Sequence, residues 1–220
     1  MTGCGEKKRT TARMPAPPPT ITRESTVPPS PAAPSRRHEK VIYTETGYAS
    51  WYGAEFHNRR AANGEIYDMN EPTAAHRTLP FGSRVRVTNL KTGESTIVRI
   101  NDRGPFVTNR IIDLSVAAAK AAGVWRPGTA PVRLDVLDAP VDILHGGRWC
   151  VQIGAFDDRD EASQLKQKLI RRYSGAKVIQ FTGPTGEWVR VRVPQDDKQR
   201  AQEVAKNTQT SAPVWLVRID

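Results

Sequence analysis

Residues 84–106 read RVRVTNLKTGESTIVRINDRGPF and predict two strands joined by a tight loop. In Arg84–Thr88 and again in Thr96–Ile100, apolar and polar side chains alternate, as they do in a strand with one buried face. Leu90–Glu94, between them, has the composition of a hairpin loop. We therefore expect an antiparallel strand pair that runs into the polar motif Asn101–Phe106.

Short apolar stretches broken by Gly, Asn and Pro continue on both sides of this pair. The stretches that read as strands are Gly47–Gly53, Ser83–Asn89, Ser95–Asn101, Ile111–Leu114 and Val132–Leu137. The one clear helix is Ser115–Ala122, with Ser115 as its N-cap and Gly123 at its end. Residues 45–139 therefore predict a small β-barrel with one helix.

After Pro140 the pattern changes to strand, helix, strand, strand, helix, strand. The predicted elements are strand Trp149–Phe156, helix Arg159–Tyr173, strands Ala176–Phe181 and Glu187–Val193, helix Asp196–Lys206 and strand Val214–Ile219. This order gives a four-stranded antiparallel sheet with two helices on one face and the other face open. Residues 140–147 are then a linker and residues 148–220 a second domain.

Alternation along two of these strands predicts the side chains on the open face. Trp188, Arg190 and Arg192 are expected to point to solvent, because the valines between them face the helices. By the same rule, the strand 149–156 places Cys150, Gln152, Gly154 and Phe156 on the open face.

The N-terminal segment has a different composition. Residues 5–40 contain eight prolines and no aromatic residue, so they cannot bury enough apolar surface to fold, and residues 1–44 are predicted to be a disordered tether. Thr2-Gly3-Cys4 resembles the end of a bacterial lipoprotein signal, in which the Cys is acylated, but the apolar segment that precedes such a Cys is missing. Either Met1 is an internal start, or the resemblance is accidental.

Charge and composition exclude several classes of protein. The 220 residues include 33 Lys+Arg and 23 Asp+Glu, a net charge of +10. Half of this excess lies in residues 1–40 and no basic stripe is present, so nucleic-acid binding is not indicated. No apolar run is long enough to predict a membrane-spanning helix. The four histidines have no metal-ligand spacing with the two cysteines, so no metal and no cofactor are predicted.

Four polar motifs in the barrel region are too specific for a plain core. They are Ala49–Gly53, Ala62–Met69, Thr73–Gly82 and Arg99–Phe106. Their order, spacing and residue identities closely resemble those of the rare lipoprotein A family, whose fold is a six-stranded double-psi β-barrel related to that of expansins. Residues 148–220 resemble the SPOR domain that often follows this barrel.

The resemblance implies an endolytic lytic transglycosylase that cleaves peptidoglycan glycan strands lacking stem peptides and leaves 1,6-anhydro-muramic acid ends. It also implies a periplasmic, lipid-anchored protein of the bacterial envelope, with Cys4 acylated. Its SPOR domain would direct it to the division septum, where division proteins are candidate partners. The family's functional positions fall on Glu65, His76 and Asp102. Some relatives have lost one of these residues and bind without cleaving, so a non-catalytic glycan-binding protein is the alternative.

The chemistry of these residue types fits cleavage. A glycosidic bond needs a proton donor at its leaving oxygen, and a carboxyl that stays protonated near neutral pH can supply the proton and later take one from the sugar's C6 hydroxyl. We assign this role to Asp102. Arg103 lowers a neighbouring carboxyl's pKa unless it points to substrate or to another carboxylate. The motif could also be a mere turn, His76 a hydrogen-bonded residue under a loop, and Glu65 a solvated turn residue.

Further side chains are predicted to bind sugar. Either Trp51 or Tyr52 can stack on a ring, since alternation lets only one of them face outward. In the second domain, Gln152 can bond hydroxyls and acetamides, Phe156 or Trp188 can stack, and Arg190 and Arg192 can pair with carboxylates. The family resemblance supplies the ligand, since SPOR domains prefer glycan whose muramic acid carboxylates are free.

Overall fold

A computed structural model describes residues 40–220. The predictions for Cys4 and for nearly all of the tether 1–44 lie outside these residues. In the part of the chain that the model describes, no helix is both long and apolar enough to cross a membrane.

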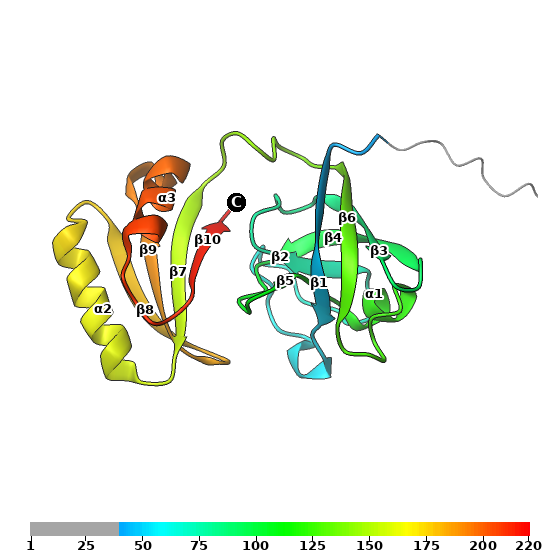
Figure 1. The fold of residues 1–220 in the computed structure, drawn as a ribbon, viewed down its shortest axis with the longest axis horizontal. Helices are drawn as coiled ribbons and strands as arrows, with labels where there is room; N and C mark the ends of the chain where they lie inside the picture. The colour runs from blue at the N-terminus through cyan, green and yellow to red at the C-terminus, as the bar shows by residue number, and fades with distance from the viewer. Residues whose placement is uncertain (1–39) are drawn as a thin grey trace, which may run out of the picture. The chain divides into compact units, whose positions relative to one another are not determined.

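The first folded region is a closed six-stranded barrel (Figure 1). Its strands are β1 (Tyr43–Trp51), β2 (Thr73–His76), β3 (Arg84–Asn89), β4 (Ser95–Asp102), β5 (Arg110–Leu114) and β6 (Ala130–Asp138). They neighbour one another in the order β1-β5-β2-β4-β3-β6, with β1 parallel to β5 and β2 parallel to β4. The prediction of a double-psi β-barrel is confirmed.

The barrel core comes from the alternation seen in the sequence. Val85 and Val87 of β3 are fully buried, as is Ile100 of β4, and β3 pairs antiparallel with β4 across the predicted loop. The strand β2 was not predicted as a separate element. All four of its side chains are buried, so it has no polar face from which a period-2 pattern could be read.

The barrel helix α1 (Val116–Ala121) begins where the sequence predicted, because Ser115 caps it. The Ser115 hydroxyl accepts a hydrogen bond from the Ala118 backbone N–H at 3.2 Å and donates one to the Glu71 carbonyl at 2.6 Å. Ser115 and Ala118 are both fully buried, so without the hydroxyl the Ala118 N–H would have no partner, whereas the Glu71 carbonyl also accepts a hydrogen bond from the Thr73 N–H at 2.9 Å.

We expect Ser115→Ala to lower the free energy of unfolding by about 1 to 2 kcal/mol, since it removes a helix cap and leaves the buried Ala118 N–H unpaired. Urea denaturation measures this difference. Ser95→Ala, at an exposed position on β4, is the matched control and should change the stability little. Equal stabilities of the two variants would contradict the capping role.

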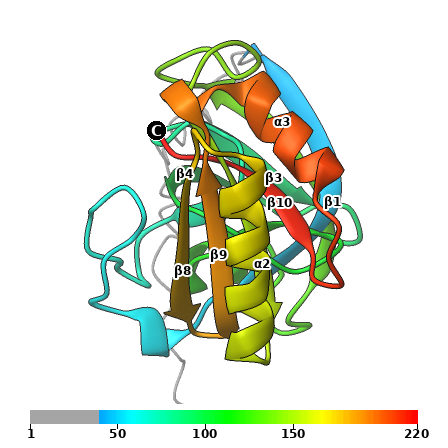
Figure 2. The same ribbon diagram turned by 90° about the vertical axis from the view of Figure 1, so that its left-hand side faces the viewer.

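The second folded region is a four-stranded antiparallel sheet with helices on one face. It contains β7 (Trp149–Phe156), α2 (Arg159–Arg172), β8 (Lys177–Gly183), β9 (Gly186–Arg192), a short 3-10 helix (Pro194–Asp196), α3 (Lys198–Asn207) and β10 (Val214–Arg218). The strand order is β10-β7-β9-β8. Figure 2 shows α2 and α3 on the same side of this sheet, and Val189, Val191 and Val193 lie in the core beneath them. The predicted arrangement is confirmed.

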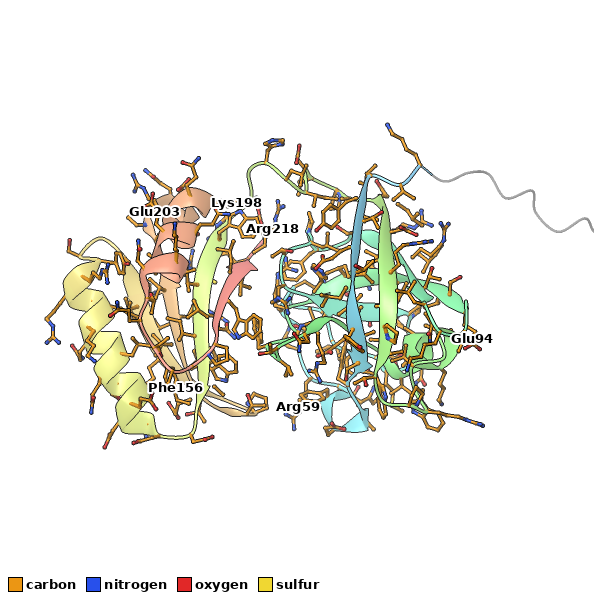
Figure 3. The ribbon with its side chains drawn as sticks, viewed as in Figure 1. Arg59, Glu94, Phe156, Lys198, Glu203 and Arg218 are labelled. Atoms are coloured by element: carbon orange, nitrogen blue, oxygen red, sulfur yellow. The ribbon has the colours of Figure 1, made fainter. Side chains whose placement is uncertain are left out.

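Phe156 does not lie on the open face, which corrects the prediction. The pairing of β7 with β9 shifts register between Gly154 and Phe156, and such a bulge turns the following side chain to the other face. Phe156 (labelled in Figure 3) is therefore 3% exposed and belongs to the helix-side core with Ala162 and Leu165. It is not available to bind sugar.

Candidate active site

Asp102 stands at the end of β4, next to Ala75 of the parallel strand β2. Its Oδ1 accepts hydrogen bonds from the backbone N–H groups of Ala62 at 2.9 Å and Arg103 at 2.8 Å. Among residues 40–220 no hydrogen-bond donor reaches Oδ2, so this oxygen is open to a ligand. Burial raises the pKa of Asp102 above its usual value, although the two backbone bonds and the charge of Arg103 act against this.

Asp102 lines a cavity with a volume of about 570 Å³. Its walls come from the barrel and from the second sheet. Residues of the wall that carry functional groups include Tyr52, Asp102 and Asp113 from the barrel, the barrel arginines Arg59, Arg60, Arg103 and Arg110, and Gln152, Trp188 and Arg190 from the sheet. The cavity therefore joins the predicted acid to five of the predicted substrate-binding residues, which are Tyr52, Arg103, Gln152, Trp188 and Arg190.

Asp113 is a second carboxyl in this cavity, and the sequence analysis missed it. Ala75 pairs with Asp102 on one side and with Asp113 on the other, so the two carboxyls lie two strands apart on one surface. Burial raises the pKa of Asp113 to about 6, Arg110 opposes this from 3.1 Å, and the charge of Asp102 adds to it. An acidic residue inside the buried apolar strand 110–114 was the signal that could have identified it.

Glu65 is not in the cavity wall but supports it. Its carboxylate accepts hydrogen bonds from Arg99 at 2.7 and 2.9 Å, and this pairing holds the pKa of Glu65 below its usual value. The backbone of Glu65 bonds to the Asn63 side chain and to the Ala61 N–H. These bonds fix the turn that presents the Ala62 N–H to Asp102.

His76 lies under a loop, which was one of the two interpretations of its sequence position, and outside the cavity wall. Its Nδ1 accepts hydrogen bonds from the backbone N–H groups of Thr78 at 3.2 Å and Leu79 at 3.0 Å, and its Nε2 is 3.2 Å from the carboxylate of Glu45. Burial lowers the pKa of His76, so the neutral ring donates from Nε2 to Glu45. A direct contact of His76 with substrate is therefore not supported.

Tyr52, rather than Trp51, faces the cavity. Tyr52 lines it, and its ring lies 4.5 Å from the ring of Tyr67. Trp51 packs against the barrel core and lies 6.4 Å from Trp125. The predicted choice between the two residues is resolved, and Trp51 is corrected to a structural residue.

The guanidinium of Arg103 binds carbonyl oxygens of both domains, and because Arg103 also lines the cavity, its contact with substrate stays a prediction. It donates to the carbonyls of His76 and Leu79 in the barrel and to those of Arg218 and Asp220 in the second domain. It also stacks over Phe81 at 3.5 Å. Burial lowers its pKa to about 10, so it stays charged at neutral pH and joins the two domains.

The predicted open face of the second sheet is partly covered by the barrel. Gln152 and Trp188 are only 3% and 4% exposed, and Trp188 lies 5.5 Å from Phe106 of the barrel, measured between ring centroids. Trp188 therefore does not point to solvent. Arg192 is corrected as well, because it bonds both carboxylate oxygens of Asp196 at 2.9 and 2.6 Å and is not in the cavity wall.

No metal-binding constellation was found in the described range, residues 40–220, where no three His, Cys, Asp or Glu side chains gather suitably. Cys150 is buried there as a free thiol, and burial raises its pKa to about 11. It is therefore protonated at neutral pH and chemically inert.

The protein therefore has two domains. The first is a double-psi barrel with a buried carboxyl in a cavity, and the second is a sheet domain of βαββαβ order. Residues 44–134 match the family model described as lytic transglycolase, and residues 145–216 match that of the SPOR domain. The chain therefore contains a lytic transglycolase domain followed by a SPOR domain, and in this it is similar to the proteins named RlpA.

Three relatives illustrate the similarity. The endolytic peptidoglycan transglycosylase RlpA of Vibrio cholerae is 43% identical over 150 residues, which are 65% of this chain and 57% of that protein. The protein of the same name from Neisseria meningitidis is 60% identical over 99 residues, 45% of this chain and 41% of that one. The probable endolytic peptidoglycan transglycosylase RlpA of Synechocystis is 60% identical over 91 residues, 41% of this chain and 28% of that one. The chain thus matches little more than half of the first relative's length and less of the others.

Proposed function

We propose that this protein is an endolytic lytic transglycosylase of peptidoglycan, with Asp102 as its acid and base. The observation that carries the proposal is the buried carboxyl of Asp102, which has one oxygen fixed by two backbone N–H groups and the other open to the cavity. The names of its relatives support the same reaction.

The proposed reaction needs one proton and no water. Protonated Asp102 donates its proton to the oxygen that leaves C1 of N-acetylmuramic acid, and the C1–O bond breaks. The sugar's own C6 oxygen then bonds to C1, and the C6 hydroxyl proton passes to the Asp102 carboxylate. The products are a 1,6-anhydro-muramic end and a free hydroxyl on the next sugar, and Asp102 is protonated again.

The other carboxyls cannot easily replace Asp102. Pairing with Arg99 keeps Glu65 ionised at neutral pH, so it has no proton to give. The Oδ1 of Asp113 is fully buried without a partner in the described chain, and its Oδ2 is bonded to Arg110.

Glu65 and His76 are proposed to be positioning residues. Glu65 holds the turn that carries the Ala62 N–H, and His76 holds the Thr78–Leu79 turn, whose Leu79 carbonyl binds Arg103. Both turns therefore fix a backbone donor to Asp102. This accounts for the three positions that the family resemblance marks, although only one of them lies in the cavity.

The finer assignments extend this proposal. The substrate is glycan without stem peptides, and the SPOR domain directs the protein to the septum, where such glycan would collect. The predicted tether ends before β1, which begins at Tyr43, and residues 140–147 form the linker between the barrel and the SPOR domain. Acylated Cys4 holds the protein to a membrane of the envelope, which labelling of the native protein with a fatty-acid probe tests.

The test of the reaction is the chemistry of its products. Purified sacculi, treated with an amidase and then with the protein in H₂¹⁸O, should release fragments ending in 1,6-anhydro-muramic acid without ¹⁸O, as measured by mass spectrometry. Reducing ends that carry ¹⁸O would identify a hydrolase. Retention of the protein on sacculi with no soluble product would identify a glycan-binding protein that does not cleave.

A further inference from the structure

The SPOR domain is part of the wall around Asp102 because several contacts join it to the barrel. The Arg218 N–H donates to the Arg77 carbonyl at 3.0 Å, and the Arg77 guanidinium lies 4.9 Å from the ring centroid of Trp215. Arg218 (labelled in Figure 3) is itself 1% exposed. Together with Arg103, these contacts hold β10 against the barrel and place the face of β7 and β9 over the cavity.

Arg190 brings a positive charge to this cavity. Its Nε and Nη2 donate to Oε1 of Gln152 at 3.2 and 2.6 Å, and it lies 5.0 Å from the ring centroid of Phe181. Gln152 and Phe181 thus fix the plane of the guanidinium. Within residues 40–220 no carboxylate forms an ion pair with Arg190, whereas its neighbour on the same face, Arg192, is paired with Asp196.

A fixed guanidinium without a carboxylate partner, in the wall of a cavity, suits a carboxylate ligand. Glycan without stem peptides offers one carboxylate on each muramic acid. A stem peptide removes that charge by converting the carboxylate to an amide, and it adds bulk that a cavity of about 570 Å³ has little room for. The cavity therefore contains both a group that can cleave the strand and a group that can distinguish its two forms.

We infer that Arg190, oriented by Gln152, is the residue that selects peptide-free glycan for cleavage, by binding a muramic acid carboxylate in the same cavity as Asp102. This inference rests on the proposed function and deepens it. It makes the SPOR domain a wall of the catalytic site, in contrast to a separate module that only anchors the protein to the sacculus.

The test uses peptide-free glycan fragments of a few sugars, too short to span two separate sites, and the full chain. We expect Arg190→Met to lower kcat/KM by about 10- to 100-fold, the range for losing a hydrogen bond to a charged group. Arg192→Met, two positions along the same face but outside the cavity, is the control and should cleave like the wild type. Circular dichroism verifies that both variants are folded.

A second arm changes the substrate and leaves the protein intact. When the muramic carboxylates of the fragments are reduced to alcohols, kcat/KM of the wild type should fall by the same factor. On these reduced fragments, Arg190→Met should lower kcat/KM no further. The inference would be overturned if Arg190→Met cleaved the unreduced fragments as fast as the wild type does. It would also be overturned if Arg190→Met lowered kcat/KM by the same factor on the reduced fragments as on the unreduced ones. If the wild type cleaves nothing, the proposed function fails. In that case calorimetry measures the binding of both fragments to the wild type and to Arg190→Met, and it tests separately whether Arg190 binds the muramic acid carboxylate.

Discussion

Asp102→Asn lowers the rate of glycan cleavage by at least about 100-fold, the lower range for losing a general acid and base. The amide keeps an oxygen that can accept from the Ala62 and Arg103 N–H groups, so the backbone around it stays in place. What is lost is the transferable proton. Release of 1,6-anhydro fragments from amidase-treated sacculi measures the effect.

The control for this variant is Asp68→Asn, on the loop that carries Ala62. Asp68 is partly exposed, accepts hydrogen bonds from Asn70 and does not line the cavity, so activity should be retained. Undiminished turnover of Asp102→Asn would remove this carboxyl from the mechanism. If Asp113→Asn alone abolished cleavage, the acid would be on β5.

Asp113→Asn has its largest effect on the pH dependence of stability. Burial raises the pKa of Asp113 in the folded protein from 3.8 to about 6. The stability due to the protonated carboxyl is therefore complete below about pH 4 and is lost as the pH rises through 6. Over this window the loss amounts to about 3 kcal/mol, since each pKa unit corresponds to about 1.4 kcal/mol.

Asn cannot ionise, so the stability of Asp113→Asn relative to the wild type should rise between pH 4 and pH 7. This rise adds to any constant difference in stability that results from loss of the Arg110–Asp113 ion pair. Urea unfolding at both pH values measures the two differences. Asp157→Asn, at an exposed loop position, should leave the wild-type pH dependence unchanged. Parallel curves for wild type and Asp113→Asn would mean that Asp113 titrates normally.

Local patterns were enough to predict most elements of this fold. The strand pair 84–102, the Ser115 cap and the βαββαβ order depend on side-chain periodicity within a few residues, and the structure confirms them. The four buried residues of β2 have no such period. The bulge at Gly154 is likewise a local departure that alternation cannot anticipate, and it moved Phe156 to the other face.

The site depends on pairings between distant segments, and these were only partly predictable. Asp102 was identified from its motif, whereas Asp113 became a neighbour only through the shared pairing with Ala75. Trp188 and Gln152 were placed on the correct face of the sheet. Their burial could not be predicted, because it comes from a second domain that packs on that face.

The two ends of Arg103 serve different domains. Its backbone N–H donates a hydrogen bond to the Asp102 carboxylate. Its side chain donates hydrogen bonds to the carbonyls of Arg218 and Asp220, at the C-terminal end of the SPOR domain. The domains of this chain are therefore not interchangeable parts. A chimera that exchanged the SPOR domain alone would disturb the Asp102 carboxyl, unless the new partner also supplied acceptors for the Arg103 guanidinium and a donor for the Arg77 carbonyl.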